Sequence, residues 1–390
     1  MPRTLTRELR ASRHLLRSSW LLACVLLLAA ATALAACGGD DEEPAAAEAP
    51  AAPEAAEPAG PSDQLIADVI ENYADGVHAT YVTSLDSAQI LDDAVDVFVE
   101  NPTPATLEAA KRAWLEARDD YGVTEAYRFY GGPIDNEEDG PEGLINAWPL
   151  DEAYIDYVEG DPDAGIINNV DEFPEITADL IVSLNEVGGE ANVSTGWHAI
   201  EFLLWGQDLN ADGPGDRPLE DYTTNANADR RATYLATASD VLIGHLQWLV
   251  DAWAPGDSGN YRAAFLALDA NEALTNIITG IGELSRGELA GERMTVAYEE
   301  RAQEDEHSCF ADNTTNDIIA NARGIQNVWL GDFGTLRGPG IVDLVAATDQ
   351  ALADRLTEEI AVSVANATSI PAPFDAHLLA DLPDSSPGRR

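Results

Sequence analysis

Cysteine and lysine are both scarce in this chain of 390 residues. It contains three cysteines, Cys24, Cys37 and Cys309, and one lysine, Lys111. We expect Cys24 to leave with a cleaved leader and Cys37 to be modified, so Cys309 has no cysteine left for an intramolecular disulfide. The fold must then rest on its hydrophobic core, for which the roughly 320 residues beyond the leader and its linker suffice.

Positive charge is scarce as well. Lysine and arginine together number 21, against 70 aspartates and glutamates, which gives a formal net charge of −49. Such a chain repels nucleic acid and anionic lipid headgroups, so we expect no nucleic-acid partner. The charge suits cations or cationic ligands, although we attribute most of it to a general compositional bias.

Several common functional signatures are missing. The sequence has no Gly-x-Ser-x-Gly elbow, phosphate-binding loop, dinucleotide-binding fingerprint or His-Glu-x-x-His zinc motif. These absences disfavour the common hydrolase and nucleotide chemistries. The sequence also lacks an Asn-Gly pair flanked by alternating polar and apolar residues, the pattern that would predict a β-hairpin.

The first 36 residues are organised like a bacterial export signal. A basic segment precedes an apolar run over residues 20–33, which is too short to span a membrane comfortably. Residues 34–37 (Leu-Ala-Ala-Cys) resemble a lipobox, so we predict a lipid on Cys37 that anchors the protein to the membrane. A plain secretory signal with an incidental cysteine is the alternative.

The segment after the leader predicts how the protein is tethered. Residues 37–61 are rich in Ala, Glu and Pro, a composition typical of a disordered acidic linker. We therefore expect an extracytoplasmic protein, lipid-anchored on the periplasmic or cell-surface face of the bacterial membrane.

Periodic segments in the rest of the chain are almost all helical. A helix follows Thr103 and Pro104, which form a good helix start. Later candidates cover residues 173–187, 194–206, 228–253, 259–283, 288–309, 314–329 and 341–366. We predict an all-α fold built from antiparallel bundled helices.

A weak internal repeat divides this helical region. Residues 200–206 and 325–331 both run from Ile to Gly through polar and apolar residues, with Trp205 and Trp329 near their ends. The repeat predicts two related lobes. We place their bounds at 62–225 and 226–380, followed by a tail, 381–390.

The most informative segment is Gly-Trp-His-Ala-Ile-Glu-Phe-Leu-Leu-Trp-Gly, residues 196–206. His198 and Glu201 lie about 60° apart around a helix, on one side of it. A helix that is apolar all round is normally buried, and ionisable groups there need partners. The pair therefore predicts a metal, a ligand or a polar network opposite. The repeat aligns Arg323 and Gln326 with the pair, which indicates one site per chain.

A second pair of charged residues lies near the helix that begins after residue 103. Leu107, Trp114 and Tyr121 recur at seven-residue spacing, and Arg118 and Glu125 fall within about 20° of this apolar stripe. Charged residues on an apolar face are unusual. They indicate either a satisfied buried ion pair or a contribution to the site on residues 196–206.

A third cluster is the acidic run over residues 304–309, at the end of the helix predicted for 288–309. Asp305 is placed near the side of this helix that carries Met294, whereas His307 points away. The run is either a solvated helix end or part of a site.

Gly196-x-His198-x-x-Glu201 resembles the signature of the imelysin-like family. Residues 124–129, 143–157 and 292–310 resemble its iron-regulated protein A branch. This resemblance implies an all-α fold with two related helical-bundle lobes and a site between them. Its implied site residues are His198 and Glu201 as ligands or hydrogen-bonding groups, Glu125 as a third, and Arg118, Arg293, Asp305 and Glu306 as weaker candidates.

Three functions fit these features. The favoured one is a protein that binds a divalent or ferric transition metal, iron foremost, in iron uptake or homeostasis, with an iron-transport protein as partner. The second is a metallopeptidase that uses the motif around His198 and Glu201 to activate water on a metal. The third is a receptor for haem or a protein, in which this pair is a structural network. Whether the protein is an enzyme is open at this point.

Overall fold

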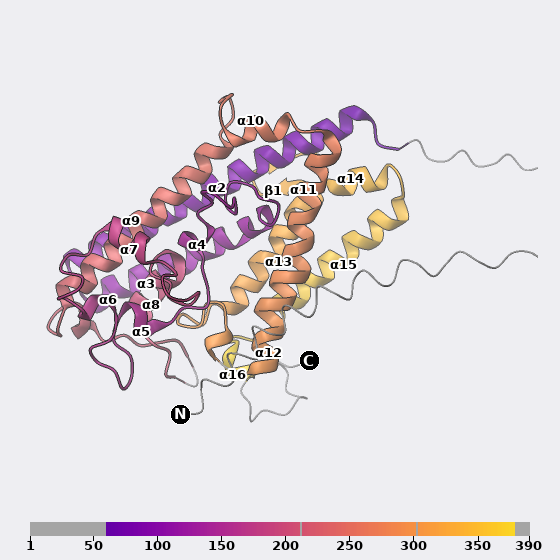
Figure 1. Ribbon diagram of the computed structural model, residues 1–390. Coiled ribbons are helices and arrows are strands. Elements are labelled where there is room, and N and C mark those ends of the chain that lie inside the picture. The colour runs from indigo at the N-terminus through magenta and orange to yellow at the C-terminus, as the bar shows by residue number, and fades with distance from the viewer. Residues whose placement is uncertain (1–59, 211–212, 302, 379–390) are drawn as a thin grey trace, which may run out of the picture. The chain divides into compact units, whose positions relative to one another are not determined.

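The computed structural model describes residues 60–210, 213–301 and 303–378, apart from the side chain of Glu304 (Figure 1). The predicted leader, the lipidation site Cys37, the tether up to residue 59 and the 381–390 tail lie outside these residues and stay predictions. The described residues belong to one structural unit.

Helices dominate the described chain, which confirms the predicted all-α fold. Six long helices carry most of the core: α2 (Asp63–Glu100), α3 (Pro104–Gly122), α9 (Ala228–Trp253), α11 (Ala270–Glu283), α13 (Thr314–Leu330) and α15 (Gln350–Thr368). Shorter helical segments connect them: η1 (Val123–Tyr127), α4 (Glu142–Ile145), α5 (Glu152–Ile155), α6 (Gly165–Asn168), α7 (Ala178–Leu184), α8 (Gly196–Trp205), η2 (Leu219–Tyr222), α10 (Tyr261–Leu266), η3 (Leu284–Val296), α12 (Ala297–Glu300), η4 (Gln303–Asp305), α14 (Ile341–Ala346) and α16 (Asp375–Leu378).

One small hairpin interrupts the helices. Strands β1 (Asp332–Phe333) and β2 (Leu336–Arg337) pair antiparallel, with Asp332 opposite Arg337. No sequence signal predicted this hairpin. Its turn contains Gly334, at φ 82°, and has no Asn-Gly pair.

Helix α3 forms as its sequence predicts. Thr103 caps it with a side-chain bond to the backbone N–H of Thr106, and Pro104 occupies the first turn. Leu107, Trp114 and Tyr121 are buried along one face. Apolar residues at this spacing place one side of the helix against the core. Arg118, which lies close to this stripe, is therefore directed into the core as well.

Helices α2, α3 and α9 run side by side, and α13 packs against α3 and α15 (Figure 1). One hydrophobic cluster extends from Val69 on α2 to Leu344 on α14 and includes residues before and after position 225. Helix α9, which follows the expected lobe boundary, contacts both α2 and α8. The core therefore does not itself mark a division at 225/226, and the lobe bounds stay a prediction.

The two segments of the weak repeat both end their helices at a glycine with positive φ. Helix α8 stops at Gly206, at φ 74°, and α13 stops at Gly331, at φ 67°. Gly331 adopts the left-handed conformation that commonly ends helices, whereas Gly206, at ψ −168°, lies outside it; glycine adopts both without strain. A Cβ on Gly331 would also lie 2.6 Å from the carbonyl oxygen of Gly338.

Four expected helices are shorter or broken, and the one expected for 173–187 covers only Ala178–Leu184. Residues 259–283 and 341–366 each divide where an aspartate caps a new helix: Asp269 bonds the N–H of Asn271, and Asp349 bonds that of Leu352. The helix expected for 288–309 ends at Glu300, because Arg301 adopts φ 55°. This early end has the largest consequence for the site, since it releases the segment that carries His307.

Within the part of the chain that is described, no helix combines the length and the apolar character needed to cross a membrane.

Candidate functional site: a buried histidine, carboxylate and arginine network

Helix α8 carries its histidine and glutamate into the core, as the sequence predicts. His198 is 1% exposed and Glu201 0%. The Nδ1 atom of His198 lies 2.9 Å from Oε2 of Glu201, and Oε1 of Glu201 accepts a hydrogen bond from the backbone N–H of Ala311, also at 2.9 Å. The helical spacing of three residues is what allows the two side chains to meet.

His307 faces this pair, which the helix expected for 288–309 did not predict. Its ring centre lies 4.8 Å from that of His198, in an edge-to-face arrangement. Its Nδ1 lies 2.7 Å from Oδ2 of Asp317 on α13. The expected helix was wrong at this end, because the chain leaves the helix at Arg301 and places His307 in the core.

Arg118 links helix α3 to this histidine. Its Nε lies 3.3 Å from Oδ1 of Asp317, one NH2 group lies 3.2 Å from Nδ1 of His307, and the other donates to Oδ1 of Asn146 at 2.5 Å. The guanidinium is 1% exposed. Arg118 thus has partners on three separate segments, and its role in a functional site stays a prediction.

Glu125 lies in η1, directly after α3, and is held by two arginines. Its Oε2 accepts from Arg293 at 2.7 Å and from Arg128 at 3.0 Å, and its Oε1 accepts from Asn146 at 2.7 Å. Burial alone would raise the pKa of Glu125, but the two guanidinium groups outweigh it and lower the pKa to about 2. Glu125 is therefore a charged, paired carboxylate.

These contacts define one buried assembly, called the His198 network below. Its members are Arg118, Glu125, Arg128, Asn146, His198, Glu201, Arg293, His307 and Asp317. Among the described residues Glu125 makes no direct hydrogen bond to His198. The connection runs through Asn146, Arg118 and His307.

The sequence resemblance gave Arg293 only as a weak candidate, yet it is central. It is 1% exposed and lies on η3, a π-helical segment, from which it reaches both Glu125 and Oδ1 of Asn321 on α13. Asp305 and Glu306 lie elsewhere. Asp305 is half-buried in η4, and Glu306, although 1% exposed, is not bonded to any member of the His198 network among the described residues.

Burial sets the protonation of the central pair. It lowers the pKa of His198 well below its ordinary value, and the charge of Arg118 lowers it further. It raises the pKa of Glu201, although the N–H of Ala311 counteracts this. The imidazole is therefore neutral. Its second nitrogen, Nε2, is buried and finds no hydrogen-bond partner among the described residues.

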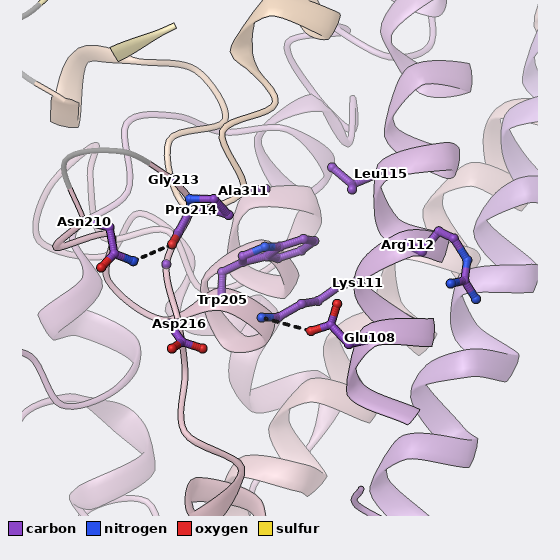
Figure 2. Close-up of a pocket in the computed structure, with 11 residues that line it drawn as sticks. Glu108, Lys111, Arg112, Leu115, Trp205, Asn210, Gly213, Pro214, Asp216 and Ala311 are labelled. Carbon is purple, nitrogen blue, oxygen red and sulfur yellow. Dashed lines mark hydrogen bonds and ion pairs between the residues drawn. The ribbon is translucent and has the colours of Figure 1, made fainter. Parts of the chain in front are cut away.

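A cavity of about 830 Å³ lies next to the network (Figure 2). Its wall includes Trp205 of α8 and Ala311, whose N–H holds Glu201. Lys111, the single lysine of the chain, places its Nζ 3.9 Å from Glu108 and 5.5 Å from the ring centre of Trp205. His198 and Glu201 do not line this cavity. A ligand in this cavity would contact Ala311, which holds Glu201 in place, but would not contact His198 or Glu201.

The predicted metal ligands do not converge in this arrangement. Both carboxylate oxygens of Glu201 and of Glu125 already accept hydrogen bonds. Of the three predicted ligand residues, His198 alone therefore keeps a possible metal-binding atom, Nε2, without a hydrogen bond among the described residues. Within the described residues, a different group of possible ligands does converge: Asp208, Asp312 and Asp375 each place one carboxylate oxygen within 4.8 Å of the others.

The fold and the site define a class: an all-α protein with a buried histidine–carboxylate pair set among arginines. The family model for imelysin matches residues 77–387, and the chain belongs to the imelysin family. A relative from Synechococcus elongatus, named Iron-regulated protein A, is 25% identical over 320 residues, which cover 79% of this chain and 77% of that protein.

Two solved structures share the fold. A candidate iron-regulated protein A precursor from Parabacteroides distasonis has a TM-score of 0.65 and 19% identity, over 82% of this chain and 89% of that one. An imelysin-like protein from Psychrobacter arcticum has a TM-score of 0.58 and 14% identity, over 81% and 87% of the two chains. At these identities the likeness supports the fold alone.

Proposed function

We propose that this imelysin-family protein binds a transition metal, iron foremost, in iron uptake or homeostasis outside the cytoplasm. The name of its Synechococcus relative, Iron-regulated protein A, supports a link to iron. An iron-transport protein would be its partner. The predicted lipid on Cys37 would hold it at the membrane, and a Cys37→Ser variant that stays with the membrane fraction would contradict this anchor.

The observation that carries the metal proposal is the state of His198. A metal-binding imidazole ligates through one nitrogen while the other is held by a carboxylate or carbonyl, which fixes its orientation. His198 has this arrangement: Glu201 engages Nδ1, and Nε2 is left without a partner among the described residues. We assign His198 as the ligand and Glu201 as the residue that orients it or joins it in the coordination shell.

The charges around the pair fit a cation in part. The three arginines of the His198 network pair with Glu125, Asp317, Glu142 and Glu288. Glu201 forms no hydrogen bond with a described arginine. A metal ion near Nε2 would supply that missing positive charge and favour ionised Glu201. His307 is the nearest further donor, once Asp317 and Arg118 release it. Glu125 as a third ligand stays a prediction that requires Arg293 to move.

The test is a titration of the full protein with Fe²⁺, Mn²⁺, Zn²⁺ and Cu²⁺. His198→Ala should lose at least about tenfold in affinity for the bound metal, and Glu201→Gln about 10–100-fold. His245→Ala is the matched control, because His245 is half-buried on α9, outside the network. Equal affinity in wild type and His198→Ala would contradict the proposal.

One observation favours the structural alternative: apart from His198 Nε2 and Arg128 and Arg293 Nε, the network's side chains are hydrogen-bonded, and all of them except that of Arg128 are buried. A receptor that uses the pair only for structure would keep its metal affinity in His198→Ala and lose thermal stability. The metallopeptidase alternative requires peptide hydrolysis that disappears in His198→Ala and persists in His245→Ala. Haem binding would show as a Soret shift that depends on His198.

A further inference from the structure

Three aspartates that the function above does not use converge on one point. Asp208 follows α8, Asp312 precedes α13, and Asp375 begins α16. One carboxylate oxygen of each lies within 4.8 Å of the others. They come from distant parts of the sequence, so the tertiary fold alone brings them together.

Two of these aspartates, Asp208 and Asp312, differ in their burial and in their hydrogen-bond partners. Asp208 is 9% exposed and accepts a hydrogen bond from the backbone N–H of Asn210 at 2.9 Å and another from Gln303. Asp312 is half-buried, and both of its carboxylate oxygens are shielded from solvent without a hydrogen-bond partner in the described part of the chain. A shielded carboxylate without donors is costly unless it gains a proton or a cation.

A fourth carboxyl group is buried against these three. Glu306 is 1% exposed, and its Oε2 finds no hydrogen-bond partner within the described residues. Burial first, and then the charges of Asp375, Asp312 and Asp208, raise the pKa of Glu306 to about 9. Glu306 therefore lies close enough to the aspartates for their charges to act on it. The four residues are called the aspartate cluster below.

The surroundings of the cluster contain little positive charge. Asp208, Asp312 and Glu306 form no ion pair with any described arginine, lysine or histidine. In the His198 network, by contrast, Glu125 has two arginines within 3.0 Å. An external cation would therefore balance the charge of Asp208, Asp312 and Glu306.

We propose that Asp208, Asp312 and Asp375, with Glu306 beneath them, bind a hard divalent cation of the calcium class. All the donors are carboxylate oxygens, which favour Ca²⁺, whereas iron(II), zinc and copper also seek nitrogen or sulfur. Oxygens within 4.8 Å of one another fit around an ion at roughly 2.3–2.6 Å from each ligand. Bound cation would fasten the start of α16 to the loop after α8 and to the turn before α13.

This site is independent of the proposed metal site at His198, and the experiment separates the two. Calcium binding is measured on the full, chelator-treated protein by calorimetry and by the thermal midpoint. We expect Ca²⁺ to bind with a dissociation constant of about 0.1–1 mM, as in extracellular modules, or tighter, and to raise the midpoint. Mg²⁺ should do so less.

Two variants and two controls decide the result. Asp312→Asn and Asp208→Asn should each lower calcium affinity at least about tenfold, whereas Asp163→Asn, at an exposed aspartate, and His198→Ala should leave it unchanged. Circular dichroism of each variant checks that it folds. Wild-type affinity in both cluster variants, or no calcium binding by the wild type at about 1 mM, would overturn the proposal. Tighter binding of Fe²⁺ or Zn²⁺ than of Ca²⁺ at these aspartates would overturn the assigned cation class.

Discussion

Glu306 and His307 are consecutive residues, yet they belong to two polar clusters that balance charge differently. In the His198 network Glu125 is buried beside Arg293 and Arg128, and its pKa falls to about 2. In the aspartate cluster Glu306 is as deeply buried, and its pKa rises to about 9. Equal burial therefore gives opposite shifts. The partner, not the depth, decides the charge of a buried carboxyl group.

The two clusters also differ in whether they need an external cation to balance their charge. The His198 network supplies its own counter-charges and leaves the Nε2 atom of its central histidine without a partner among the described residues. The aspartate cluster lacks positive side chains around three of its four carboxyl groups in the described chain. We therefore expect the first cluster to stabilise the fold by itself, and the second to do so only with a cation.

The largest expected effect comes from breaking the self-balanced cluster. Glu125→Gln leaves Arg293 and Arg128 buried without their carboxylate, which should lower the free energy of unfolding by about 3–5 kcal/mol. Urea unfolding followed by circular dichroism measures this. Glu138→Gln, at an exposed loop position, is the control and should change little. A loss below about 1 kcal/mol would mean that the Glu125 pairs contribute little.

Acid should weaken the same cluster. The folded pKa of Glu125, about 2, lies below its ordinary value of 4.5, so its contribution is fully present above about 4.5 and is lost as the pH falls toward 2. The stability difference between wild type and Glu125→Gln should therefore shrink by about 3 kcal/mol over this window. A difference that does not depend on pH would contradict the lowered pKa.

The aspartate cluster should respond in the opposite direction. Because the folded pKa of Glu306, about 9, exceeds the ordinary 4.5, stability is fully present below about 4.5 and is lost as the pH rises toward 9. In chelator, Glu306→Gln should stabilise the protein at pH values near 8 by about 1 kcal/mol or more and have little effect in acid. Thermal unfolding across pH tests this, and destabilisation near pH 8 in chelator would refute it.

Salt should give the smallest effect. Raising monovalent salt from about 0.01 M to about 1 M shortens the screening length from roughly 30 Å to roughly 3 Å. The repulsion among the aspartates of the cluster should weaken, which should stabilise the chelator-treated wild type by about 0.5 kcal/mol more than Asp312→Asn. An equal salt response of the two proteins would show that repulsion within the cluster does not limit stability.

Local features of the site follow from the sequence. Residues 196–206 predict a buried helix with His198 and Glu201 on one side, and the structure has both. The stripe on α3 likewise predicts that Arg118 is buried. Spacing of three or four residues fixes which side chains of a helix meet, because the geometry of one helical turn is the same everywhere.

Distant partners did not follow from the sequence. Arg293 reaches Glu125 across 168 residues, and His307 was misplaced because a single left-handed residue, Arg301, ended its helix early. No spacing rule connects such positions. Their meeting depends on how long helices pack and where loops turn, which periodicity does not encode.

By itself, the sequence determined the class of fold, the family and the buried pair on α8. Only the tertiary structure decided that Glu125 is bound by arginines, that His307 faces His198, and that Asp208, Asp312 and Asp375 converge. The reason is the distance along the chain over which each effect acts. Helical periodicity and capping act within a few residues, whereas the charge of a buried group is set by whichever side chains the packed core brings beside it.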